Sequence, residues 1–136
     1  MRFLLAWNSS VQYHDVAART RDWKYILNLH PEFQHHTHDS RHGVGKGILY
    51  WKTWLAAAES NPAAAAIVNR YVKRPSEELY DLKADPHEVH NLAADPKQSR
   101  RLSSMRDELK AWMKSQGDRE TVFGKPLLHG EPVTLL

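Results

Sequence analysis

The chain has 136 residues, the size of one ordinary domain, and its 41% hydrophobic and 26% charged residues are typical of a folded globular protein. It contains no cysteine, which excludes disulfides, thiolate metal sites and thiol nucleophiles. The net charge of +3 is too small and too scattered to favour nucleic-acid binding.

Residues 1–12 show no clear secondary-structure pattern. Their apolar stretch, from Phe3 to Trp7, is too short for a signal peptide. The alanine-rich run from Pro62 to Val68 is far shorter than a bilayer span. We therefore expect neither a signal peptide nor a membrane segment, and the cellular location stays open.

Residues 17–29 are predicted to form a β-hairpin with a tight turn near Arg21 and Asp22. The second half of this segment is rich in β-branched and aromatic residues. Alternation with a period of two places four apolar side chains on one face, which we expect to be the core face: Trp23, Tyr25, Leu27 and Leu29.

The next part of the chain predicts a loop followed by two helices. The stretch from His30 to Gly47 is polar and contains three glycines, which indicates a loop. Residues 48–59 have the apolar spacing of a short helix. Pro62 suits the first position of a second, alanine-rich helix that ends before Pro75. We interpret the two helices as an insertion.

A short strand and the longest helix complete the predicted elements. Residues 77–82 are predicted to form the strand, and Asp95 is the expected N-cap of the helix, with Gln98 as the return partner of a capping box. Gly117 is placed to end this helix in a left-handed conformation. Its apolar residues recur at helical spacing: Leu102, Met105, Leu109, Trp112 and Met113.

Together these elements predict an α+β fold. We expect a small antiparallel sheet of about four strands that packs against the long C-terminal helix from Pro96 to Gln116, with the two helices as an insertion. Residues 118–136 are rich in glycine and proline and are expected to form an extended C-terminal tail.

Two segments resemble the C-terminal region of the sulfatase family, nearest to its N-sulfoglucosamine sulfohydrolase (heparan N-sulfatase) branch. Residues 18–28, ARTRDWKYILN, are similar to the family's RTxxxKYIxN hairpin. Residues 78–93, ELYDLKADPHEVHNLA, are similar to its ELYDLxxDPxExxNLA segment, which precedes the final helix. The order of the segments and the helix after them extend the resemblance over residues 13–117, which we take as one sulfatase C-terminal-like subdomain.

The resemblance implies a subdomain that docks on a large α/β catalytic domain and helps to shape its substrate cleft. Sulfatases of this type convert a Cys or Ser in a C/S-x-P-x-R motif to formylglycine and bind calcium through carboxylate and amide oxygens. Here the only Ser-x-Pro, Ser60-Asn61-Pro62, lacks the arginine, and no Asp-Asp or Asp-Asn pair occurs. We therefore expect no catalytic residue in this chain, with calcium and formylglycine confined to the catalytic domain.

The resemblance also supplies candidate substrate-binding residues. In the related branch, a histidine and an acidic residue in the region before the hairpin lie close to the substrate cleft, which implies this role for His14 and Asp15. Arg19 is the third candidate, because it could face an anionic glycan. Glu88 and Asn91 are interpreted instead as a structural joint whose polar side chains bond loop backbone.

The loop after the hairpin contains the densest set of potential metal ligands: His35, His36, His38 and His42, beside Asp39. Neutral imidazoles at such spacing can bind zinc, nickel or copper. A glycine-flanked loop would lose conformational entropy on binding, however. A solvated loop is therefore the favoured interpretation, and a metal site is the alternative.

Three functional hypotheses remain. The first is a C-terminal subdomain or fragment of a sulfatase, structural and cleft-shaping, whose partner is the catalytic domain or an oligomer partner. The second is a stand-alone binding module for sulfated glycans that uses Arg19, Arg21, Lys24 and the histidine loop. Such a module would bind tightly at physiological salt, whereas under the first hypothesis we expect only weak and mainly electrostatic contact with sulfated glycans. The third is a metal-binding protein. We expect neither nucleic acid nor a membrane as a partner.

Overall fold

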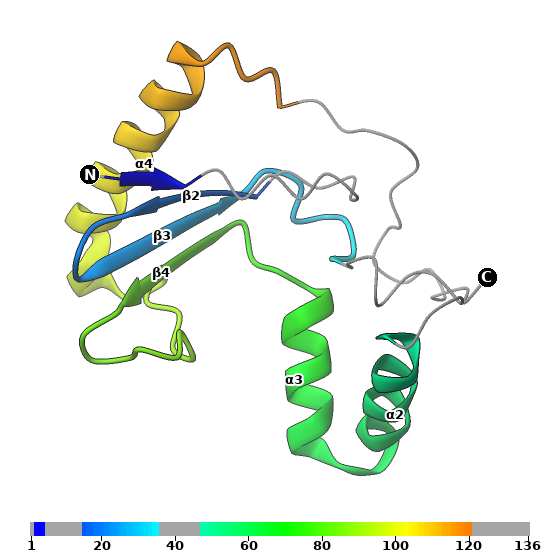
Figure 1. Ribbon diagram of the computed structural model, residues 1–136. Coiled ribbons are helices and arrows are strands. Elements are labelled where there is room, and N and C mark those ends of the chain that lie inside the picture. Colours follow the sequence, from blue (N-terminus) through cyan, green and yellow to red (C-terminus); the bar gives the residue numbers. More distant parts are fainter. Residues whose placement is uncertain (1, 5–14, 36–46, 121–136) are drawn as a thin grey trace. The chain divides into compact units, whose positions relative to one another are not determined.

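The computed structural model describes residues 2–4, 15–35 and 47–120 (Figure 1). The chain forms two compact units. The first contains the strands and the C-terminal helix, and the second contains the two inserted helices. This architecture confirms the predicted α+β class.

Four antiparallel strands form a sheet in the order β1-β2-β3-β4. They are β1 (Arg2–Leu4), β2 (Asp15–Arg19), β3 (Trp23–Asn28) and β4 (Glu77–Asp81). The predicted hairpin is confirmed as β2 and β3, and the strand predicted over residues 77–82 is confirmed as β4. The edge strand β1 lies in the segment that showed no clear pattern in the sequence.

The turn of the hairpin is closed by Thr20 and Trp23. The Thr20 N–H donates to the Trp23 carbonyl at 2.8 Å, and the Trp23 N–H donates to Thr20 Oγ1 at 3.0 Å. A threonine hydroxyl that accepts from a backbone N–H a few residues on is a common way to fix a turn. The turn thereby fixes the strand register, in which Arg19 lies opposite Lys24.

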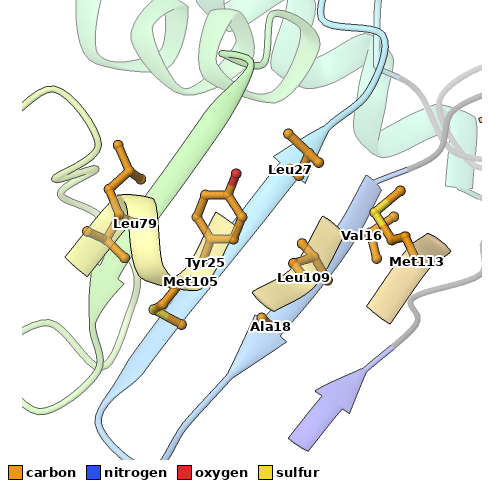
Figure 2. Packing of buried hydrophobic residues seen from close by; sticks show 9 residues of the cluster. Val16, Ala18, Tyr25, Leu27, Leu79, Met105, Leu109 and Met113 are labelled. Carbon is orange, nitrogen blue, oxygen red and sulfur yellow. The ribbon is translucent and has the colours of Figure 1, made fainter. Parts of the chain in front are cut away.

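One face of the sheet forms the core with the C-terminal helix (Figure 2). Register places Ala18 opposite Tyr25 and Tyr25 opposite Leu79, and all three are fully buried. Leu27 is also buried, while Trp23 and Leu29 pack against the cluster and are partly exposed. The predicted core face of β3 is therefore confirmed.

The C-terminal helix begins with a 3₁₀ turn, η1 (Pro96–Gln98), and continues as α4 (Ser99–Ser115). The Asp95 side chain caps this start, since its Oδ1 accepts from the Lys97 N–H at 2.9 Å. The predicted capping box is wrong, because the Asp95 N–H donates to the Leu92 carbonyl rather than to Gln98. The tighter first turn changes which backbone groups need a partner.

Helix α4 buries the side chains that its apolar spacing predicted, with one exception. Leu102, Met105, Leu109 and Met113 are buried in the core, whereas Trp112 is only partly buried at its edge. Gly117 ends the helix with φ +71°, and its N–H donates to the Lys114 carbonyl at 3.1 Å. This left-handed end is the one that the glycine predicted.

The second unit contains α2 (Gly47–Ser60) and α3 (Pro62–Val72), as predicted (Figure 1). Asn61 caps α3, because its Oδ1 accepts from the backbone N–H groups of Ala63 and Ala64. Trp51 is buried and lies 4.9 Å from the Tyr71 ring, whereas Trp54 is 49% exposed. Among the described residues, no helix is long and apolar enough to cross a membrane.

Candidate functional site

The candidate substrate residues Asp15 and Arg19 lie at opposite ends of β2. In the strand register Asp15 lies opposite Asn28, and Arg19, which is exposed, lies opposite Lys24. A four-residue separation corresponds to about 13 Å along a strand. The structure therefore does not bring the two side chains together, and His14 lies outside the described residues.

The sheet face that carries Asp15 and Arg19 is opposite to α4 and contains a polar network. Asn28 Nδ2 lies 2.8 Å from Glu78 Oε1 and 2.6 Å from the Pro75 carbonyl, to which it donates. The Tyr80 hydroxyl donates to the other oxygen of Glu78. Asn28 and Tyr80 are both buried, at 7% and 6% exposure. The Asn28 Nδ2 and the Tyr80 hydroxyl thus have partners within the protein, as buried polar groups require.

An ion pair joins the hairpin to the loop after β4. Lys24 Nζ lies 2.5 Å from Glu88 Oε2, and both side chains are about a quarter exposed, at 26% and 29%. Glu88 has φ 55°, a left-handed conformation that residues other than glycine rarely adopt. We expected Glu88 to bond loop backbone, but its carboxylate pairs with Lys24 on the neighbouring strand instead.

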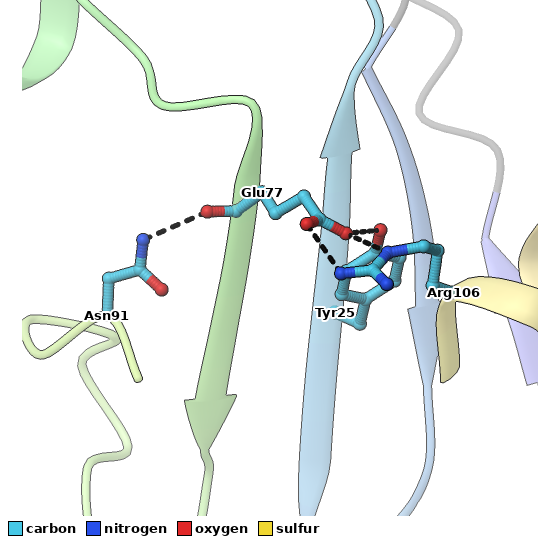
Figure 3. A network of polar contacts seen from close by, with 4 residues as sticks. All are labelled: Tyr25, Glu77, Asn91 and Arg106. Atoms are coloured by element: carbon cyan, nitrogen blue, oxygen red, sulfur yellow. Dashed lines mark hydrogen bonds and ion pairs between the residues drawn. The ribbon is translucent and has the colours of Figure 1, made fainter. Parts of the chain in front are cut away.

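Asn91 ties the same loop to β4. Its Oδ1 accepts from the N–H groups of Leu79 and Ala93, each at 2.9 Å. Its Nδ2 donates to the Glu77 carbonyl at 3.0 Å, the bond drawn in Figure 3. Because one amide side chain bonds three backbone groups, the loop follows the strand closely. This confirms the interpretation of Asn91 as a structural joint.

Glu77 connects the sheet to α4 (Figure 3). Arg106 donates to both of its oxygens, from Nε at 2.6 Å and from Nη2 at 2.7 Å, and the Tyr25 hydroxyl donates to Oε1 at 2.5 Å. The hydrogen bonds from Arg106 hold the pKa of Glu77 below its usual value, and burial raises the pKa of Tyr25 above its usual range. Neither group is prepared to exchange a proton near neutral pH, so the network is structural.

A pocket with a basic lining lies in the first unit, beside the hairpin turn. It is an open hollow of about 450 Å³, lined by Thr20 and Trp23 of the hairpin and by seven residues of the C-terminal helix: Lys97, Gln98, Arg100, Arg101, Ser104, Met105 and Glu108. The Arg101 guanidinium lies over the Trp23 ring, 4.0 Å from its centroid. A cation held against an indole face in this way is a cation–π contact.

Three of the residues that line the pocket are basic: Lys97, Arg100 and Arg101. Within the described part of the chain, no carboxylate forms an ion pair with any of them. The one acidic residue of the lining, Glu108, accepts from the Ser104 hydroxyl at 3.2 Å. With three basic residues and one acidic residue in its lining, the pocket has a net positive charge.

Sequence reasoning missed these residues because it considered only the apolar positions of the helix. A signal was present, however. The first turn of a helix favours acidic side chains, since backbone N–H groups give it a partial positive charge. This helix has no acidic residue in its first turn and three cations between Lys97 and Arg101.

The histidine loop is described only as far as His35. The His35 backbone N–H donates to the Val72 carbonyl at 2.7 Å. The His35 ring packs edge-on against the Tyr71 ring, with the ring centroids 5.2 Å apart. His36, His38 and His42 lie outside the described residues. The residues that are described contain no group of three or more potential metal ligands. The structure therefore does not test the metal site, which stays the alternative to a solvated loop.

A search of protein-family models found no match to this chain, and neither did a search of curated proteins. The resemblance to sulfatases therefore depends on the two sequence segments alone.

Proposed function

We propose that this chain is a C-terminal subdomain of a sulfatase, with a structural and cleft-shaping role and no catalysis of its own. One observation carries the proposal: the two segments that resemble the family form one interlocked unit. Strand β3 comes from the first segment and β4 from the second, and they pair side by side although the inserted helices separate them in the chain.

The polar residues of the resembling segments make the connections between them. Lys24 of the first segment pairs with Glu88 of the second. Asn28 of the first bonds Glu78 of the second at 2.8 Å. Residue types that would be interchangeable on a solvated surface therefore have specific partners here. This supports the view that the two segments resemble the family as one structural unit rather than as two chance matches.

The proposal assigns the chemistry to a partner. The nucleophilic formylglycine and the calcium ion would belong to a sulfatase catalytic domain, supplied by the same polypeptide or by an oligomer partner. This chain would dock on that domain and form part of the wall of its cleft. Asp15 is the described residue that we place nearest to the substrate, on the sheet face opposite α4.

A chimera tests the proposal. Residues 13–117 would replace the corresponding subdomain of an enzyme of the heparan N-sulfatase branch, and calcium-dependent sulfamidase activity would be measured with and without the replacement. We expect activity well above that of the catalytic domain alone. An Asn91→Ala chimera should lose this gain, and the matched control His90→Ala should retain it, because the His90 side chain is 80% exposed. A chimera in which both parts fold but do not associate would contradict the proposal.

The other two hypotheses have less support at the residues first named for them. Of the hairpin cations, Lys24 is engaged by Glu88, so it is not available as a glycan ligand. Three of the four loop histidines lie outside the described residues, so the metal-binding hypothesis gains nothing from the structure.

A further inference from the structure

We propose that the pocket beside Trp23 binds an oxyanion, the sulfate or phosphate monoester group of a small sugar, with Arg100, Arg101 and Lys97 as its ligands. This inference does not depend on the proposed sulfatase role. It depends on the position of the three cations, on the contact that orients one of them, and on the absence of acidic partners among the described residues.

Arg101 is oriented for such a ligand before the ligand arrives. Its guanidinium lies over the Trp23 ring at 4.0 Å, and Trp23 itself is held by the turn bonds with Thr20 and by packing against the core. Stacking uses the flat face of the guanidinium, whereas its N–H donors lie in the plane of the group. The donors therefore remain available to the oxygens of a tetrahedral anion.

Arg106 differs from the basic residues of the pocket, because it forms an ion pair that stabilises the fold. Arg106 lies little more than one turn further along α4, and it forms two short bonds to Glu77 that join the helix to the sheet. Arg100 is exposed and has no such partner within the described part of the chain. Positive side chains at the start of a helix are also unfavourable, because the backbone N–H groups there carry a partial positive charge. Fold stability therefore does not account for Lys97 and Arg100, whereas Arg101 also has its contact with the Trp23 ring.

The size and charge of the pocket indicate the ligand class. A volume of about 450 Å³ lies in the lower part of the range for small-molecule sites, which suits a monosaccharide. Glu108 lies about 10 Å beyond Arg101 along the helix axis. An anionic group is thus favoured at the Lys97–Arg101 end of the pocket, and the neutral part of a sugar could extend toward Glu108.

NMR titration of the full chain tests this inference. The ligands are glucosamine 6-sulfate, glucosamine 6-phosphate and unsubstituted glucosamine, at an ionic strength of about 0.05 M to limit screening. We expect saturable shifts of the backbone N–H signals of Thr20, Trp23 and Lys97 with at least one of the two esters, and none with glucosamine. The ester that binds more tightly identifies the source of the oxyanion.

Variants then separate this pocket from general charge. Arg101→Gln and Arg100→Gln should each raise the Kd roughly tenfold, because each removes a charge-assisted hydrogen bond. Lys114→Gln is the control, since it removes an exposed cation of α4 that does not line the pocket and lies about 20 Å beyond Arg101 along the helix axis. It should leave the Kd within about a factor of two, as a distant surface charge does. The inference is overturned if neither ester gives saturable shifts, or if Lys114→Gln weakens binding as much as Arg101→Gln.

Discussion

Lys24 and Glu88 form an ion pair, with Nζ and Oε2 2.5 Å apart, across 64 residues of sequence. The pair joins the hairpin to the loop after β4, and Glu88 reaches its partner from a left-handed backbone conformation with φ 55°. A residue other than glycine in this conformation strains the backbone. The pair therefore lies at a point where backbone strain and a side-chain interaction oppose each other.

Replacement of Glu88 can separate these two effects. Glu88→Ala and Glu88→Gly both remove the ion pair, but glycine adopts φ 55° without strain. We expect Glu88→Gly to be more stable than Glu88→Ala by about 1 kcal/mol in urea unfolding. Lys24→Ala should lower the stability of the native sequence by up to about 1 kcal/mol, as expected for a partly exposed pair, and should have little effect on either Glu88 variant. Equal stability of the two Glu88 variants would show that the strain is absent.

Asn91→Ala should destabilise the fold by about 1–3 kcal/mol, because it leaves the N–H of the fully buried Leu79 without its acceptor. Asn91→Asp keeps an acceptor but loses the donor to the Glu77 carbonyl, so its effect should be smaller. His90→Ala is the neighbouring control. Urea midpoints of the three variants provide the measurement, and similar midpoints for Asn91→Ala and His90→Ala would contradict the role of Asn91.

Leu109→Ala should destabilise the fold by about 2–5 kcal/mol, since Leu109 is fully buried between α4 and the sheet. Sequence spacing alone would select Trp112 for this experiment. Trp112 is only partly buried, however, and its replacement by alanine should have a smaller effect than that of Leu109. Lys110→Ala, on the exposed side of the helix, is the control. If Trp112→Ala proves more damaging than Leu109→Ala, the helix face is assigned wrongly.

Acid should weaken the fold in part through Glu77. Arg106 lowers the pKa of Glu77 in the folded state below that of the unfolded chain, which is about 4.3. The stabilisation is therefore fully present above the unfolded pKa and is lost as the pH falls through the folded pKa.

The Glu77→Gln variant tests this pH dependence. It should be less stable than the native sequence at neutral pH, and its stability should fall less between about pH 6 and pH 3. Some dependence should remain, because hydrogen bonding from the His90 backbone also lowers the pKa of Asp85. Chemical unfolding across this range provides the measurement. Parallel curves for the two proteins would exclude Glu77 as a source of the acid sensitivity.

The purified chain should not hydrolyse aryl sulfates or N-sulfoglucosamine, even with calcium and a formylglycine-generating enzyme. The reason is chemical, because the sequence has no cysteine and its only Ser-x-Pro, Ser60-Asn61-Pro62, is followed by two alanines. Turnover is compared with a buffer blank and with a mock purification from the same host. Activity that follows the chain through further purification would contradict the prediction.

The sequence by itself was sufficient for the local elements. Alternation in Trp23–Asn28 predicted a strand with Tyr25 and Leu27 in the core, and Pro62 and Gly117 marked the start of one helix and the end of another. Such signals depend on residues close together in the chain, so they can be interpreted without the fold. The cysteine count excluded thiol chemistry on the same basis.

Tertiary structure alone decided which distant residues meet. Nothing near Glu77 in the chain indicates that Arg106 will bind it, and nothing near Trp23 indicates that Arg101 will stack on it. The same limit applies to β1, which is too short to be recognised and forms because β2 offers it a free edge. These contacts depend on how the sheet and α4 pack, which is a property of the whole first unit rather than of any local pattern.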